Sequence, residues 1–199
     1  MTGGSEAIET PRRPHTSTRN TAMSVMVVGR PEADEYAPFY ADYVSRVPEA
    51  NPIEAMSAQI GPTTALLGRV AEAEAGARYA PGKWSVREVV GHLADAERIF
   101  SYRALRIARG DATPLPGFDE TAYVPAGRFD ERTLADLVSE LANARRSTLD
   151  LFRSFGEAEW RRRGIASGKP ISVRALGRII PGHERHHVEV LGTRYGLRG

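Results

Sequence analysis

The side chains most able to do chemistry in this chain are histidines near its C-terminal end. Three of the five histidines fall within the stretch RIIPGHERHHVEVL at 178–191. His183, Glu184 and His187 spell H-E-x-x-H, a pattern that places two zinc-binding imidazoles one helical turn apart. Proteases with this pattern take a third ligand from further along the chain, but only 12 residues (199 − 187) follow His187, and none is a histidine. Glu189 projects to the other side of the helix. The protease interpretation therefore fails, and a third ligand must come from upstream.

A helical wheel separates these histidines by direction. The buried stripe of the helix that begins near Ser172 is defined by its apolar residues, Val173, Leu176, Ile180 and Leu191. At 100° per residue, His187 lies about 20° and His183 about 60° from the centre of this stripe. His186 lies about 120° away, so we expect it to be a bystander on the far flank. Two inward imidazoles at i and i+4 can share one metal ion, although a single inward histidine is more often a hydrogen-bonded core residue.

Glu184 also projects toward the buried side, and two roles are open for it. It can support a metal site by orienting a ligand or transferring a proton. Alternatively, it can pair with Arg185 or with an arginine of a neighbouring helix.

The third candidate ligand is His92, on a second helix. Ser85 and Glu88 form a capping box that predicts a helix start, and Gly110 predicts its end. His92 lies about 80° from the centre of that helix's apolar stripe, at a position that can face a neighbouring helix. Three neutral imidazoles with an open further position are typical of a catalytic rather than a structural zinc site. His15 lies in the N-terminal tail and is left out of the site.

The elements that must position these histidines are helices, because no long alternating strand pattern occurs. Four long helices are predicted, at 52–74, at 85–110, at about 130–155 and from Ser172 onward, preceded by a short aromatic helix or lead-in segment at 32–47. Pro62 and Pro181 should kink the first and fourth helices, and Pro62 can split the first. The two connections, 111–129 and 156–170, are predicted to be irregular, and the longer one has the length of a functional loop. This pattern predicts an all-α fold, a four-helix bundle with crossover topology.

Composition narrows the class of protein. The 199 residues suggest one domain, which we place at 28–199 after an N-terminal tail, 1–27, that we expect to be disordered. A net charge of +2 does not indicate nucleic-acid binding. There are no cysteines, which removes thiolate ligands, cysteine nucleophiles and disulfides, and fits a reducing cytoplasm. No stretch has the roughly 20 apolar residues of a membrane span.

Several stretches of the chain resemble a known family. GRPEADEYAPFYADYVSRVP, RYAPGKWSVREVVGHLADAERIFSYRALRIARGDATPLPGFDE, ISVRAL and GHERHH are closely similar to the DinB-like (YfiT-like) superfamily of metal-dependent hydrolases, over about 28–198. The resemblance implies a bundle in up-up-down-down order, usually dimeric. It also implies a divalent metal ion, for which we expect zinc or nickel, held by His92, His183 and His187. Members include hydrolases and thiol-dependent transferases or isomerases that use bacillithiol or mycothiol. Pro62 and Pro181 depart from the family's usual pattern.

The leading hypothesis is a cytoplasmic, homodimeric, metal-dependent enzyme acting on a small molecule. The ion would activate water, as in a hydrolase, or a low-molecular-weight thiol, as in a transferase or isomerase. The alternative is a non-catalytic protein that binds a ligand or responds to stress through the same ion. Neither nucleic acid nor membrane is an expected partner. The catalytic residues beyond the metal ligands are not assigned by the sequence.

Overall fold

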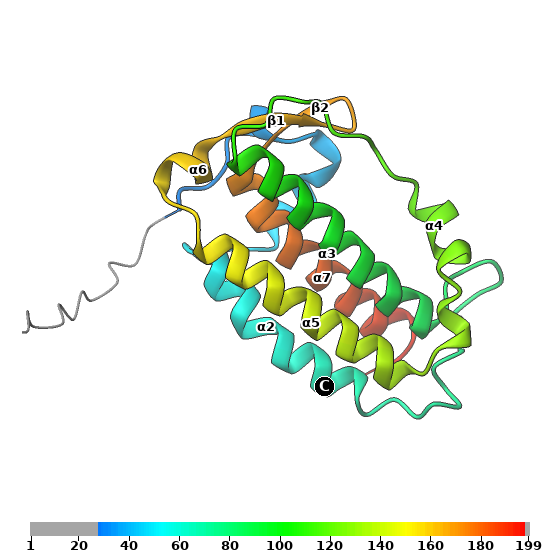
Figure 1. The fold of residues 1–199 in the computed structure, drawn as a ribbon. Helices are drawn as coiled ribbons and strands as arrows, with labels where there is room; N and C mark the ends of the chain where they lie inside the picture. The colour runs from blue at the N-terminus through cyan, green and yellow to red at the C-terminus, as the bar shows by residue number, and fades with distance from the viewer. Residues whose placement is uncertain (1–27, 198–199) are drawn as a thin grey trace, which may run out of the picture.

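Four long helices form the body of the protein in the computed structural model, which describes residues 28–197 (Figure 1). They are α2 (Pro52–Leu67), α3 (Val86–Ala108), α5 (Leu134–Arg153) and α7 (Val173–Arg194). The predicted all-α, four-helix bundle is therefore confirmed, with each predicted long helix present. The tail at 1–27, with His15, lies outside the described residues.

In the bundle, α2 lies diagonally opposite α3, and α5 lies diagonally opposite α7. Both α2 and α3 pack against α5 and α7. The α3 and α5 helices begin at the same end, because Glu72 contacts Arg87 of α3 and accepts a hydrogen bond from the backbone N–H of Leu134 at the start of α5. Arg178 of α7 donates to the carbonyl of Ala50, just before α2, so α2 and α7 begin together at the other end. In chain order the helices run up-down-down-up, whereas we expected up-up-down-down.

The connections explain this order. Only 109–133 runs the length of the bundle, because it joins the parallel helices α3 and α5 (Figure 1). The stretches at 68–85 and 154–172 join antiparallel helices and stay at one end. The connections 111–129 and 156–170 were expected to be irregular, but each of these regions contains short regular elements. The connection between α3 and α5 holds α4 (Glu120–Gly127) and a 3-10 helix, η3 (Phe129–Glu131). The second holds α6 (Glu157–Arg161) and an antiparallel hairpin of β1 (Arg163–Ala166) and β2 (Lys169–Ser172). These elements are too short to show a periodicity.

An N-terminal segment covers one side of the bundle. It contains two 3-10 helices, η1 (Ala33–Glu35) and η2 (Pro38–Tyr40), and the short helix α1 (Ala41–Ser45), in agreement with the expected aromatic lead-in. Buried Arg178 holds this segment on α7 through the backbone carbonyls of Val28, Val47, Glu49 and Ala50. The segment thereby places Tyr40 and Tyr43 beside α3 and α7.

The helix boundaries follow their capping residues, and the prolines do not break the helices. The predicted capping box is present: Ser85 Oγ accepts from the N–H of Glu88, whose carboxylate accepts from the N–H of Ser85. The first helix ends at Leu67, earlier than expected. The α2 helix continues through Pro62, which is exposed, so the carbonyl it leaves unpaired can reach water. The α7 helix likewise continues through Pro181.

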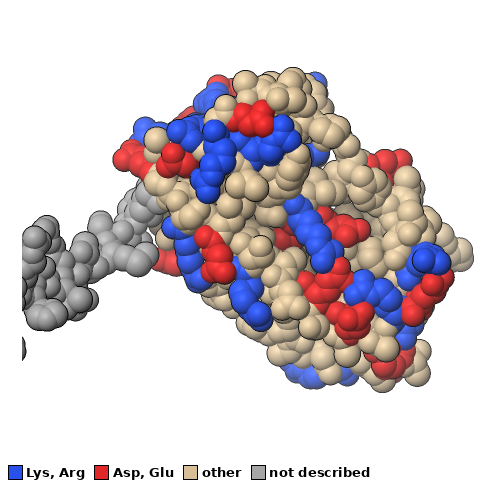
Figure 2. Space-filling model, viewed as in Figure 1, with Lys and Arg blue, Asp and Glu red and all other residues tan. Residues whose placement is uncertain are grey.

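The core consists of two apolar clusters, one toward each end of the bundle. No helix within residues 28–197 is long and apolar enough to span a membrane. On the face drawn in Figure 2, acidic and basic side chains are interspersed and do not form a single basic patch.

Candidate metal centre

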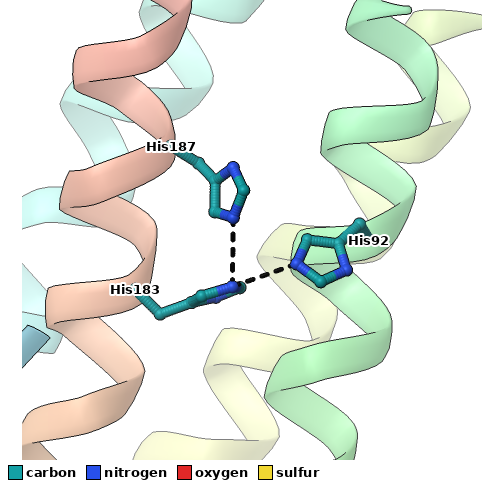
Figure 3. Close-up of side chains that lie close together, drawn as sticks. All are labelled: His92, His183 and His187. Carbon is teal, nitrogen blue, oxygen red and sulfur yellow. Dashed lines mark hydrogen bonds between the residues drawn. The ribbon is translucent and has the colours of Figure 1, made fainter. Parts of the chain in front are cut away.

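The three predicted histidines meet at the seam between α3 and α7 (Figure 3). The Nε2 atom of His183 lies 3.0 Å from Nε2 of His92 and 3.1 Å from Nε2 of His187. One ring nitrogen from each of the three lies within 4.8 Å of the others. We call this group the histidine centre. The structure thus brings the three side chains together, while their role as metal ligands stays a prediction.

Local structure explains this convergence. His92 lies two turns into α3, after the capping box, and the antiparallel α7 presents His183 and His187 one turn apart on the facing side. Gly182 lets α1 approach closely, because a Cβ there would lie 2.0 Å from the carbonyl oxygen of Tyr43. The Tyr43 ring consequently packs edge-on against His183, with 5.3 Å between ring centroids.

Burial keeps these imidazoles neutral. Loss of hydration lowers the pKa of His92 to about 4 and that of His187 to about 3, the latter with a further contribution from the neighbouring His92 and His186. The pKa of His183 lies well below its usual range, for the same reason and because three other histidines surround it. A neutral imidazole has a free lone pair on one nitrogen, which is the form that binds metal.

The donor set fits a divalent ion. Nitrogens bound to one ion at about 2.0–2.1 Å are roughly 2.8–3.4 Å apart at the ligand angles of octahedral and tetrahedral sites. The two separations at His183, 3.0 and 3.1 Å, lie in this range. Within residues 28–197, these three residues are the only group of three or more histidine, aspartate or glutamate side chains arranged in this way. Their chemistry, all imidazole and no thiolate, suits zinc or nickel.

A cavity of about 400 Å³ opens beside the histidine centre. Six of its lining residues are aromatic: Phe39, Tyr40, Tyr43, Trp84, Phe100 and Phe118. The centroid of the Trp84 ring lies 4.8 Å from that of His92, and the ring is stacked on His187 at 6.4 Å between centroids. The few polar lining residues besides the histidines include Glu120 and Ser167. A cavity of this size and character accommodates a small molecule with apolar or aromatic parts.

His186 was expected to be a bystander, but its ring lines this cavity. It packs against Tyr43, and its Nδ1 lies 3.8 Å from a carboxylate oxygen of Asp42. The helical wheel shows only that His186 points away from the apolar stripe of α7. It could not show that α1 packs on that side and forms the cavity wall next to His186. Phe118 and Ser167 were missed for a related reason, because they lie in connections whose path was not readable from periodicity. The length of the loop at 111–129 was the available signal.

Glu184 turns away from the histidine centre. It is buried and forms an ion pair with Arg145 of α5, 2.6 Å between Nη2 and Oε2, and Arg145 also pairs with Glu97 of α3 at 2.6 Å. Gln59 and Thr63 of α2 donate hydrogen bonds to the Glu184 carboxylate. We call this group, which spans all four long helices, the charged layer. Of the two roles considered for Glu184, the structure shows the ion pair with an arginine of a neighbouring helix.

Comparisons with known proteins agree with this architecture. Residues 56–191 match the model of a family described as the DinB superfamily. No curated protein matches the chain. One similar solved structure is YfiT from Bacillus subtilis, described as a probable metal-dependent hydrolase with an unusual four-helix bundle topology. It is 18% identical, with a TM-score of 0.60, and the match covers 84% of this chain and 94% of that one.

A second similar structure is a mycothiol-dependent maleylpyruvate isomerase. It is 16% identical, with a TM-score of 0.57, and the match covers 69% of this chain and 58% of that one. This chain therefore spans little more than half the length of the isomerase. At these identities, both likenesses concern the fold.

Proposed function

This chain belongs to the DinB superfamily, and we propose that it is a metal-dependent enzyme whose His92, His183 and His187 hold one divalent ion, zinc or nickel, beside the substrate cavity. The observation that carries the proposal is the convergence of three neutral imidazoles on the wall of a cavity of about 400 Å³. The descriptions of the two structures of similar fold, one as a probable metal-dependent hydrolase and one as a thiol-dependent isomerase, support it.

An ion in such a site lowers the pKa of water or of a thiol that binds to it, and so supplies a nucleophile at neutral pH. The residues of this chain would prepare the site for that chemistry. With an ion held through the three Nε2 atoms, each imidazole would carry its proton on Nδ1. Trp84 packs on two of these rings and limits their rotation.

The cavity side chains would handle substrate and protons. The aromatic walls exclude water from an apolar substrate. His186, beside Asp42 and on the cavity wall, would accept a proton at its ring and pass it to solvent.

Two reactions fit this arrangement: hydrolysis, and transfer or isomerisation with a low-molecular-weight thiol. The alternative to an enzyme is a non-catalytic protein that uses the ion to bind a ligand. The cavity against the histidines favours the enzyme, because a substrate there would lie next to the open side of the ion. The homodimer, the cytoplasmic location and the extent of the domain, 28–199, stay predictions from the sequence.

An activity screen tests the proposal. The zinc-loaded and nickel-loaded proteins would be assayed on ester, amide and thiol-transfer substrates, each with and without a low-molecular-weight thiol. We expect turnover that stops on chelation and returns when the metal is restored. Turnover that persists after chelation would overturn the metal-dependent mechanism, and ligand binding without turnover would support the non-catalytic alternative.

A further inference from the structure

Three arginines on the long helices are almost fully buried, and one of them differs from the others in its partners. Arg103, Arg145 and Arg178 are exposed by 2%, 1% and 1%. Arg145 is neutralised by two carboxylates. Arg178, which also forms no ion pair within residues 28–197, has its charge dispersed over four backbone carbonyls. Arg103 donates through Nη2 to the carbonyl of Pro116 at 2.9 Å and to the hydroxyl of Ser167 at 3.1 Å, and the Tyr40 hydroxyl is a further neutral partner. Among the described residues, no carboxylate forms an ion pair with it. A buried cation without a counter-charge is costly, and an anion nearby would relieve that cost.

The residues around Arg103 lie on the cavity wall. Its guanidinium is 5.7 Å from the ring centroid of Phe118, and its charge acts on the hydroxyl of Tyr40, whose pKa is raised mainly by burial. Phe118, Tyr40 and Ser167 all line the cavity. We call this region the Ser167 end of the cavity. The cation therefore stands directly behind three cavity-lining side chains.

Ser167 is held so that its hydroxyl hydrogen is free. It opens the two-residue turn of the hairpin, and both Ser167 and Gly168 have positive φ, 53° and 70°. Glycine, asparagine or aspartate is preferred at such a first position, so serine is kept there at some cost in backbone strain. Because Ser167 Oγ accepts from Arg103, its own O–H remains available as a donor at the cavity wall. A donor polarised by a cation behind it is suited to a negatively charged oxygen.

The α3 helix sets the distance between the two ends of the cavity. His92, Phe100 and Arg103 lie within an arc of about 80° on this helix, and the 11 residues from His92 to Arg103 (103 − 92) span about 16 Å along its axis. The Phe100 ring lies between the two ends of the cavity. Its centroid is 5.8 Å from that of His183 and 6.5 Å from that of Phe118. Glu120, a carboxylate that lines the cavity, is exposed, and its charge acts on the Tyr40 hydroxyl more weakly than that of Arg103.

We propose that the Ser167 end of the cavity binds a carboxylate of the substrate, while the apolar body of the substrate lies along Phe100 toward the histidine centre. The substrate class is accordingly an aryl or alkyl carboxylate whose reacting group is remote from its carboxylate. The choice of reacting end rests on the proposed function, but the carboxylate subsite can be tested independently of it.

Binding of a matched probe pair tests this subsite. The dissociation constants of 4-phenylbutanoate and of the uncharged 4-phenylbutanamide would be measured by calorimetry on the metal-loaded and on the chelated protein. The same titrations would be made on Ser167→Ala and on the control Ser154→Ala, whose exposed hydroxyl donates to the carbonyl of Leu151 at its own helix end. We expect the carboxylate to bind the wild type at least tenfold more tightly than the amide, and Ser167→Ala to weaken it about tenfold. This preference should persist without metal and in the control.

Four results would overturn the subsite. These are no carboxylate binding to the wild type, equal binding of carboxylate and amide, no more than a twofold change in Ser167→Ala, or a carboxylate preference that disappears on chelation because the probe was bound to the metal. Failure of the two proposals is distinguishable. A protein that prefers the carboxylate but holds no metal contradicts only the proposed function, and one that holds metal but ignores the carboxylate contradicts only the subsite.

Discussion

Consecutive residues of α7 enter two different polar clusters: His183 joins the histidine centre, and Glu184 joins the charged layer around Arg145. Both clusters lie largely within the bundle, with His187 half-buried, and both draw on α3. In the charged layer the cation belongs to the chain, and two carboxylates surround it. In the histidine centre three neutral bases face one another, and no side chain among residues 28–197 places a cation between them. The charged layer therefore holds its own cation, whereas the histidine centre has the composition of a site for an added ion.

The largest expected effect comes from breaking the charged layer. Arg145→Met leaves Glu97 and Glu184 buried without their cation, and we expect the free energy of unfolding to fall by about 3–5 kcal/mol. Chemical denaturation measures this change. Arg146→Met, at the adjacent exposed position, is the matched control and should change stability by less than about 0.5 kcal/mol. A loss below 1 kcal/mol for Arg145→Met, about that of a surface pair, would mean that this layer does not hold the bundle together.

Metal binding should stabilise the protein through the histidine centre, and this stabilisation should depend on the three histidines. At 100 times the dissociation constant, zinc should raise the free energy of unfolding of the wild type by about 2.7 kcal/mol. His183→Ala removes the ligand that contacts both of the others, so we expect no zinc-dependent increase in that variant. Denaturation with and without zinc checks both statements. Equal stabilisation of wild type and variant would place the ion elsewhere.

Acid should weaken the chelated protein through the histidine centre. The pKa of His92 is about 4 in the fold, against about 6.5 in the unfolded chain, so between these values only the unfolded state takes up the proton. Stability is then lost as the pH falls below 6.5, by about 1 kcal/mol per pH unit for each such histidine. We expect His92→Gln to show a shallower loss between pH 6.5 and 5.5 than the wild type, by about that amount. Identical slopes would show that His92 is not neutral in the fold.

The smallest effect concerns His186, the neighbour that is not a candidate ligand. His186→Ala removes a half-buried ring without opening the histidine centre, so stability should change by less than about 1 kcal/mol. If His186 carries protons, the turnover of this variant should fall while its metal content stays that of the wild type. Unchanged turnover would assign the proton transfer to another group.

The histidine centre was largely readable from the sequence, and the charged layer was not. The wheel places His183 and His187 by their angle to apolar residues of their own helix, a local property, and His92 was selected in the same way. Arg145 carried no such signal, because its partners come from three other helices. The order of helix directions was also missed, since it depends on which connection crosses the bundle. Ser167 was missed as well, because it lines the cavity from the turn of a hairpin whose strands are too short to be predicted.

The metal content of the purified protein tests whether the histidine centre binds an ion. Purified wild type, His187→Ala and His186→Ala would be loaded with zinc or nickel, dialysed and measured for bound metal per chain. We expect about one ion per chain for the wild type and for His186→Ala, and none retained by His187→Ala. Full retention by His187→Ala, or no retention by the wild type, would contradict the assignment of the histidine centre as a metal site.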